Sequence, residues 1–300
     1  GHSMTHPASI APAALQNPFL CLEVFEDAGP RISALIPAGS SQNLLAELDD
    51  TGWESPHGRY HPFGGHRLWL APEIPAITYL PEDSGAHLQF QGKSVRLWRT
   101  DTIGVHVERS IEISLEPNAP RLKIIHMLRN LSIHPLTAAP WAVTVLPMGS
   151  RVRIPLTHAL MQTNPFLPNR NVILWPYTDP TDVRLHLTHD FIELNSDPLL
   201  EAIKVGAYAS DGWAAAEING WLLVKRFTPL KMNGALDLGA NVEAYTNQTF
   251  VEFETLGSLR RLRQGEAVRY VETWEVLPGH LEDLDDQGHP GGDPTNTRDA

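Results

Sequence analysis

Apolar and polar residues alternate with a period of two along much of this chain, and this pattern constrains the fold more than any other feature. Between residues 105 and 115 the apolar positions are Val105, Val107, Ile111, Ile113 and Leu115. Such alternation is typical of β-strands with one buried face. No window of about eleven or more residues shows convincing helical periodicity. The chain is therefore expected to be all-β.

Turn signals between the strand-like segments divide the chain into many antiparallel strands. Asp211-Gly212 and Asn219-Gly220 are the strongest of them, because these dipeptides favour two-residue hairpin turns. The absence of a short fixed repeat argues against propellers and solenoids. We expect a large antiparallel β-sandwich over residues 16–280. Residues 1–15 are interpreted as a tag remnant and N-terminal arm, and the acidic, glycine-rich residues 281–300 as a flexible tail.

Charge and composition exclude several classes of partner. The chain has 23 basic and 35 acidic residues, for a net charge of −12. This balance disfavours nucleic acids and anionic membranes, because no excess of basic groups is available to neutralise phosphates. No apolar run approaches the ~18 residues of a membrane helix. We expect a cytoplasmic protein, with a removed leader as the alternative, and Cys21 allows no internal disulfide.

The segment Tyr60–Glu73, YHPFGGHRLWLAPE, combines two glycines with polar and aromatic side chains. It belongs to a stretch rich in Gly, Pro and His, residues 51–72, that we expect to be a long structured loop. His66, Arg67 and Trp69 would form a corner suited to a sugar-like or carboxylate ligand. The alternative is a tight turn whose His and Arg are merely solvated.

The strand-like segment TFVEFET, Thr249 to Thr255, carries two carboxylates on one face. Period two places Glu252 and Glu254 together, and two such groups repel unless cations, solvent or a ligand compensate them. Lys204 and Lys225 lie among apolar neighbours and could reach a cleft containing these glutamates. A paired-carboxylate hydrolase is conceivable, and the alternative is a solvent-exposed sheet face.

No recognisable metal or cofactor motif is present. The 14 histidines include His57, His61 and His66 within ten residues, but no cysteine or carboxylate pattern completes a site. The nucleophile elbow, the P-loop and the Rossmann glycine pattern are also missing. We therefore expect no metal and no cofactor.

Several motifs occur in an order that resembles the galactose mutarotase-like (aldose 1-epimerase) superfamily. They are LEVFEDAGPRISAL, GGHRLW, NLSIHPLTAAPWAVTVLPMG, the Gly-Trp hairpin and VEFETLGSLRRLRQGEAVRYVETWEV. The resemblance covers about residues 16 to 277 and is closest to a bacterial branch distinct from the true sugar mutarotases. It implies a twisted antiparallel supersandwich with a ligand cleft on the concave face of one sheet.

The resemblance also implies an acid–base pair. In family mutarotases a glutamate deprotonates the anomeric hydroxyl while a histidine protonates the ring oxygen. VEFETLG matches the base-carrying strand, so Glu254 is the first candidate base and Glu252 the second. No histidine matches the acid, because Trp141 stands near its place. His66 is our candidate replacement acid, and His134 could serve only if its loop folded back.

The sequence thus predicts a protein that recognises a small-molecule carbohydrate, and the first interpretation is an aldose 1-epimerase-like enzyme. Arg67, His66 and Lys204 would donate to ligand hydroxyl, carboxylate or phosphate oxygens, and Trp69 and Trp141 would stack on the sugar. A non-catalytic carbohydrate-binding module is the alternative, favoured by the missing histidine. A polysaccharide lyase or hydrolase is a third interpretation, although such enzymes usually carry a further catalytic domain. The oligomeric state is not predicted.

Overall fold

Antiparallel strands make up nearly all of the regular structure in the computed structural model, which describes residues 12–49, 52–156, 166–230 and 236–291. Within these residues the strands form two ten-stranded sheets and one two-stranded ribbon. Only one α-helical turn, α1 (Pro75–Thr78), and two 3₁₀ turns, η1 (Asp237–Gly239) and η2 (Leu281–Asp283), occur among them. The expected all-β antiparallel sandwich is confirmed.

The first sheet contains strands from both halves of the chain. In spatial order it comprises β1 (Pro12–Gln16), β2 (Leu20–Phe25), β3 (Arg31–Pro37), β6 (His66–Ala71), β11 (Leu136–Pro147), β20 (Phe250–Leu256), β19 (Val242–Thr246), β16 (Ile203–Ala207) and β13 (Ile173–Leu174), with β21 (Arg260–Leu262) also paired to β11. The ribbon of β4 (Trp53–Ser55) and β5 (Gly58–Tyr60) lies between β3 and β6 in sequence.

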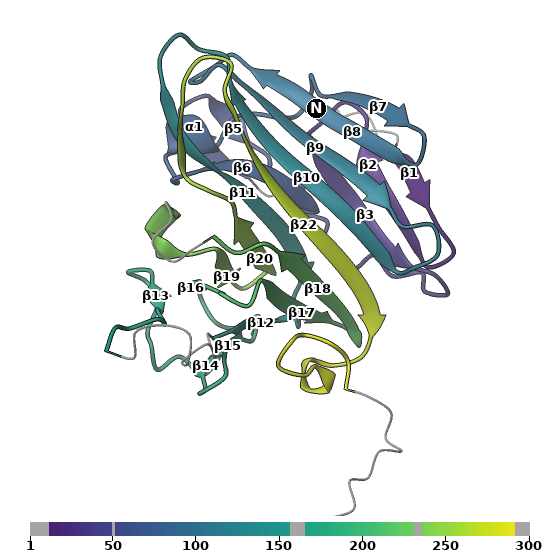
Figure 1. Ribbon diagram of the computed structural model, residues 1–300, viewed down its shortest axis with the longest axis vertical. Coiled ribbons are helices and arrows are strands. Elements are labelled where there is room, and N and C mark those ends of the chain that lie inside the picture. The colour runs from purple at the N-terminus through teal and green to yellow at the C-terminus, as the bar shows by residue number, and fades with distance from the viewer. Residues whose placement is uncertain (1–11, 50–51, 157–165, 231–235, 292–300) are drawn as a thin grey trace, which may run out of the picture.

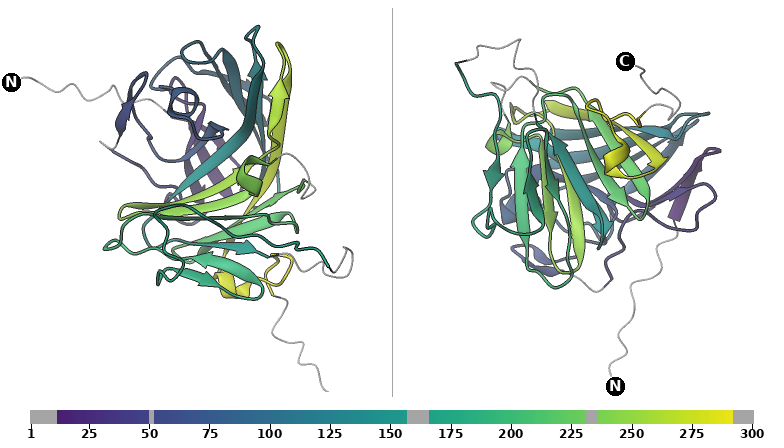
Figure 2. Two further views of the ribbon diagram at one scale, coloured as in Figure 1. Left: turned by 90° about the vertical axis from the view of Figure 1, so that its left-hand side faces the viewer. Right: turned by 90° about the horizontal axis from the view of Figure 1, so that it is seen from below.

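The second sheet is also continuous. Its order is β14 (Leu185–Leu187), β15 (Phe191–Leu194), β12 (Arg151–Pro155), β17 (Trp213–Ile218), β18 (Trp221–Phe227), β22 (Ala267–Pro278), β10 (Arg121–Asn130), β9 (Val107–Leu115), β8 (Ser94–Asp101) and β7 (His87–Gln91). The N-terminal strands, purple to blue, gather at one end of the molecule and the green strands at the other (Figures 1 and 2). The long strands β11 and β22 run between the two ends (Figure 1).

The main hydrophobic core lies between the two sheets. Its members come from alternate positions of both, such as Leu68 and Phe253 of the first sheet and Ile111 and Trp274 of the second. A second apolar cluster, which includes Trp69 and Trp141, belongs to the first sheet and its loops. We call the face that carries this second cluster the outer face, because it turns away from the second sheet.

The segment expected to be a loop contains a central strand instead. Residues His66–Ala71 form β6, which pairs with β3 on one side and β11 on the other. Gly64 and Gly65 precede this strand with φ of 84° and 69°, a region that favours glycine. A Cβ on Gly65 would lie 2.1 Å from the Ile32 carbonyl oxygen, so this position requires glycine for close approach as well as for backbone conformation.

Other expectations need correction at the sheet edges and at the end of the chain. Asn219-Gly220 does connect the hairpin β17–β18, with φ of 47° and 80°. Asp211-Gly212 connects no hairpin, because β16 belongs to the first sheet and β17 to the second. Residues 12–15 are part of β1 rather than a separate arm.

The expected flexible tail is wrong for residues 281–291. Leu281 is buried, and its carbonyl accepts a 3.0 Å hydrogen bond from Arg153. Arg226 donates to the carbonyls of Gln287 and Gly288, both at 2.7 Å. Residues 1–11 and 292–300, the remainder of the expected arm and tail, lie outside the described residues. No helix in the described part of the chain is long and apolar enough to cross a membrane.

Candidate functional site

Strand register brings polar residues from four strands together on the outer face of the first sheet. Arg67 of β6 and Glu254 of β20 both lie opposite Val143 of β11, one on each side. Lys204 of β16 lies opposite Tyr245 of β19. Six of the residues selected from the sequence meet here: Arg67, Trp69, Trp141, Lys204, Glu252 and Glu254.

Direct contacts join these side chains in two groups. Arg67 Nη2 donates to Glu252 Oε2 at 2.8 Å, and its guanidinium carbon lies 3.9 Å from the centre of the Trp69 ring. Trp141 Nε1 donates to Glu254 Oε1 at 2.7 Å, and Lys204 Nζ donates to the same oxygen at 3.1 Å. The two same-face glutamates are therefore matched to cations, one each.

Glu243 of β19 is a further member that the sequence reasoning did not select. It lies directly opposite Glu254 in the β19–β20 pairing, and its Oε1 is 3.2 Å from Lys204 Nζ. Two features of the sequence could have identified Glu243. The alternation in NVEAYT indicates a strand, and the short turn between this strand and the next sets the register that places Glu243 opposite Glu254. We refer to Arg67, Trp69, Trp141, Lys204, Glu243, Glu252 and Glu254 as the outer-face cluster.

Burial decides the charge of this cluster. Loss of solvent raises the pKa of Glu243 to about 8, because nearby Glu254 adds to the effect and Lys204 offsets only part of it. Loss of solvent also raises the pKa of Glu252 despite Arg67. For Lys204, burial opposes the charge, but Glu254 and Glu243 outweigh it and raise the pKa. The raised pKa of Glu243 favours its protonated form.

Three buried atoms of the cluster have no hydrogen-bond partner among the described residues. They are Arg67 Nε, Glu243 Oε2 and Glu254 Oε2. Glu243 and Glu254 are each 1% exposed. Buried polar atoms are nearly always paired, so unpaired ones on a single face indicate a place where a polar ligand or water binds.

Aromatic side chains surround the cluster. Trp69 and Trp141 are only 5% and 4% exposed, and Arg67 and Lys204 lie over their rings, so these indoles offer little free surface for stacking. Tyr177 is 50% exposed, and Trp175 is half-buried with Lys204 Nζ 4.7 Å from its ring centre. The ring surface open to a ligand therefore belongs mainly to the segment that follows β13.

A buried ionic network holds one wall of the cluster in place. Trp69 Nε1 donates to Tyr60 Oη at 2.8 Å, and Tyr60 Oη donates to Glu82 Oε1 at 3.2 Å. Glu82 is in turn paired with Arg31 at 2.5 Å and Arg109 at 3.2 Å. Arg31 also donates to the carbonyl of Gly64 at 2.6 Å, which fixes the Gly-Gly turn before β6.

His66 does not belong to the outer-face cluster, which corrects the expectation that it shares a corner with Arg67. Consecutive residues of a strand point to opposite faces, so the side chain of His66 enters the main core while Arg67 points outward. His66 is 0% exposed, and burial together with Lys225 and His126 lowers its pKa well below the ordinary value. It is therefore neither within reach of an outer-face ligand nor charged at neutral pH.

His134 is also distant from the glutamates. It is exposed in the turn before β11, nine residues from Val143, the partner of Glu254. Nine strand residues span about 30 Å. The loop would have to cover this whole distance for His134 to act as the acid.

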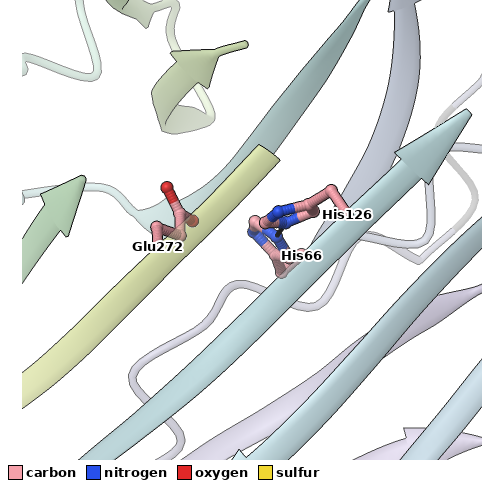
Figure 3. A group of neighbouring side chains, drawn as sticks. All are labelled: His66, His126 and Glu272. Carbon is pink, nitrogen blue, oxygen red and sulfur yellow. Dashed lines mark hydrogen bonds between the residues drawn. The ribbon is translucent and has the colours of Figure 1, made fainter. Parts of the chain in front are cut away.

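His66 is instead part of a closed hydrogen-bond network in the core. His66 and His126 meet through their Nε2 atoms at 2.9 Å, with Glu272 of β22 close to them (Figure 3). His126 Nδ1 must donate to the Tyr270 carbonyl at 3.0 Å, so His126 Nε2 accepts from His66. His66 Nδ1 then accepts from the Thr144 hydroxyl at 2.7 Å.

Lys225 and Glu272 complete this core network. Lys225 Nζ donates to Thr144 Oγ1 at 2.6 Å and lies 3.8 Å from Glu272. Glu272 accepts from the Thr255 and Tyr270 hydroxyls and the Trp274 indole, at 2.7, 2.8 and 2.8 Å.

A metal ion fits this network poorly. His66, His126 and Glu272 offer ligand atoms within 4.8 Å of one another. A metal bound by both histidines would need the lone pairs of both Nε2 atoms. This would break the hydrogen bond from His66 to His126 and the chain of donors that begins at the Thr144 hydroxyl. The metal would also lie close to the amine of Lys225. The hydrogen bonds account for the cluster without a metal.

A pocket of about 270 Å³ borders the core network at Tyr270, whose ring stacks on His126. Its lining includes Phe227, Leu230, Asn241, Arg269 and Tyr270, and no carboxylate or histidine among the described residues. It therefore lacks the proton-transfer groups that the outer-face cluster contains.

Neither protein-family models nor curated proteins match the chain, but solved structures do. A galactose mutarotase-like protein from Lactobacillus casei has a TM-score of 0.59 at 9% identity, covering 89% of this chain and 100% of that one. A galactose mutarotase related enzyme from Lactobacillus acidophilus has a TM-score of 0.54 at 10% identity, covering 90% and 99%.

The same architecture also occurs within a larger protein. A TPR-domain containing protein from Parabacteroides distasonis has a TM-score of 0.63 at 14% identity, covering 91% of this chain but 48% of that one. At these identities the similarity establishes the fold alone. The resemblance inferred from the ordered motifs is therefore confirmed at the level of the fold, which is galactose mutarotase-like.

Proposed function

We propose that the outer-face cluster binds an uncharged aldose and interconverts its anomers, with Glu254 as the base. The observation that carries this proposal is the buried carboxylate of Glu254, whose Oε2 has no partner among the described residues while Trp141 and Lys204 hold its Oε1. Two donors on one oxygen stabilise the carboxylate and fix its direction, leaving the other oxygen free to accept a proton. The mutarotase-like fold supports the choice of reaction.

The charge balance of the cluster favours a neutral sugar over a phosphorylated or acidic one. Arg67 and Lys204 are already paired with Glu252 and Glu254, and the third carboxyl group, Glu243, adds no positive charge. An anionic ligand would meet no unpaired cation within the cluster. Hydroxyl groups, which both donate and accept, match the free donor on Arg67 and the free acceptor on Glu254.

Access to the glutamates requires side-chain movement, because Glu254 is 1% exposed. The exposed ring of Tyr177 and the half-buried ring of Trp175 are the groups next to Lys204 that would turn aside and then stack on the sugar. Aromatic stacking supplies affinity without charge, consistent with a neutral ligand.

The test is anomer exchange measured by two-dimensional exchange NMR on a panel of neutral aldoses and their phosphates. We expect wild-type protein to accelerate exchange of a neutral aldose and Glu254→Gln to reduce the acceleration about 100-fold or more, the usual contribution of a general base. Glu112→Gln, a half-buried glutamate on β9 of the second sheet, is the matched control and should behave as wild type. Equal rates for wild type and Glu254→Gln would refute the catalytic role.

A non-catalytic carbohydrate-binding module is the second candidate. It is favoured by the observation that, in the described part of the chain, no histidine contacts Glu252 or Glu254, although family mutarotases use one as the acid. Saturation-transfer NMR separates the two functions. Binding of a neutral aldose without any acceleration of anomer exchange would establish the module.

A further inference from the structure

Glu243 and Glu254 form a pair of carboxyl groups whose environments differ. They lie directly opposite each other in the β19–β20 register, where side chains of neighbouring strands are about 5 Å apart. Both place Oε1 against Lys204 Nζ, at 3.2 and 3.1 Å, and both leave Oε2 buried without a partner among the described residues. The two free oxygens therefore belong to one small region beside a shared ammonium group.

We propose that Glu243 is the proton donor of this site, in the role that a histidine has in family mutarotases, and that it protonates the ring oxygen of the sugar. The inference rests on the proposed function. An anomeric carbon bears both a hydroxyl group, which must lose its proton, and a ring oxygen, which must gain one. A neighbouring carboxylate and carboxylic acid supply this acceptor and this donor.

The surroundings assign the two roles. Glu254 accepts hydrogen bonds from two donors, the Trp141 indole and Lys204. Among the described residues, Glu243 has only Lys204 as a favourable partner, and it faces Glu254 on β20 and Asp237 of η1, which both disfavour a further negative charge. Burial adds to this and raises the pKa of Glu243, which favours the acid form of this residue.

The proposed reaction is balanced in protons and electrons. Glu254 takes the proton of the anomeric hydroxyl as the C1–O5 bond breaks and the C1=O bond forms, while Glu243 gives its proton to O5. Rotation about C1–C2 presents the other face of the aldehyde. O5 then attacks C1 and returns its proton to Glu243, and Glu254 gives its proton to the aldehyde oxygen, which becomes the new anomeric hydroxyl. No oxidant, reductant or further reactant is needed.

Lys204 would balance the negative charge shared by Glu243 and Glu254 throughout the reaction. Each transfer removes a proton from one carboxyl group and adds one to the other, so the two together carry one negative charge at each stage. The ammonium group contacts both and has no need to move. Such a fixed counter-charge avoids reorganisation during the reaction.

The first experiment compares wild type with Glu243→Gln and the control Glu112→Gln for both binding and anomer exchange. The amide that Glu243→Gln introduces can donate a hydrogen bond but cannot transfer a proton, so we expect sugar binding to persist within about threefold while exchange falls about 100-fold or more. Wild-type exchange retained in Glu243→Gln would overturn the inference and leave the proposed function intact. A wild type without exchange would remove both.

The second experiment follows the Glu243 carboxyl carbon in ¹³C-glutamate-labelled wild-type protein, assigned by its absence in Glu243→Asp. We expect this carbon to titrate above neutral pH. A midpoint near the ordinary glutamate value would overturn the assignment of the proton donor, even if Glu243→Gln fails to fold. Glu243→Asp provides a further variant that retains a transferable proton, and we expect it to recover part of the exchange lost in Glu243→Gln.

Discussion

Lys225→Met tests the electrostatics of the core network. Lys225 is fully buried, and loss of solvent lowers its pKa to about 8 from an ordinary value of 10.5, with Glu272 and Glu254 opposing part of the decrease. A pKa difference of about 2.5 corresponds to about 3 kcal/mol. The ammonium form of Lys225 therefore reduces the free energy of unfolding by this amount, relative to the neutral amine.

The direction of the pH dependence of stability follows from the pH at which the folded and the unfolded chain each lose the Lys225 proton. Below about pH 8 both folded and unfolded chains hold the Lys225 proton, so the cost is fully present. Between about pH 8 and 10.5 the unfolded chain still binds the proton while the folded chain has released it, so stability rises with pH. Relative to Lys225→Met, wild type should gain up to about 3 kcal/mol across this interval. Tyr270, which contacts Glu272, keeps its proton because burial raises its pKa well above the ordinary value.

Urea unfolding followed by tryptophan fluorescence, at intervals from pH 7 to 10.5, measures this difference. Lys123→Met, an exposed lysine on β10, is the matched control, and its difference from wild type should remain flat. The titrating groups that do not interact with Lys225 are common to all three proteins and cancel in the comparison. A flat difference for Lys225→Met as well would show that Lys225 is not desolvated in the core, and the network derived above would be refuted.

Two further predictions concern the support of the site. Glu82→Gln should reduce the free energy of unfolding by about 3–5 kcal/mol, because Arg31 and Arg109 lose a buried counter-charge, and chemical unfolding at neutral pH measures it. Gly65→Ala should cost clearly more than the ~1–2 kcal/mol of left-handed backbone, because its Cβ would lie 2.1 Å from the Ile32 carbonyl oxygen. Gly39→Ala, with φ of 78° and open space around it, should cost only the backbone contribution, and equal losses in the two variants would contradict the close approach.

The fold class was accessible from the sequence because alternation is a local property. Strands with one solvent-facing side, such as β9 with its buried Ile111 and Ile113, carry their own period-two signal. The assignment of strands to sheets is not local. Asp211-Gly212 has the composition of a hairpin turn, yet it lies where the chain crosses from one sheet to the other, which only long-range pairing decides.

The same distinction separates the parts of the site that were predicted from those that were not. Glu252 and Glu254 could be paired because they belong to one strand. Their meeting with Lys204 and Arg67 depends on pairings across 50 and 185 residues, which composition cannot supply. His66 was misplaced because glycines and prolines around β6 suggested a loop, and because HRLWLA is buried on both faces and carries no polar–apolar alternation. Once β6 is a strand, His66 and Arg67 must diverge.

That divergence gives the central strands two polar clusters with opposite roles, separated by the thickness of one sheet. On the outer face two carboxyl groups share one ammonium group, and burial raises the pKa of Glu243. On the inner face a single carboxylate, Glu272, is held by three neutral donors, so burial favours loss of the proton from Lys225 instead. The clusters also interact, because Glu254 is one of the charges that raise the pKa of Lys225.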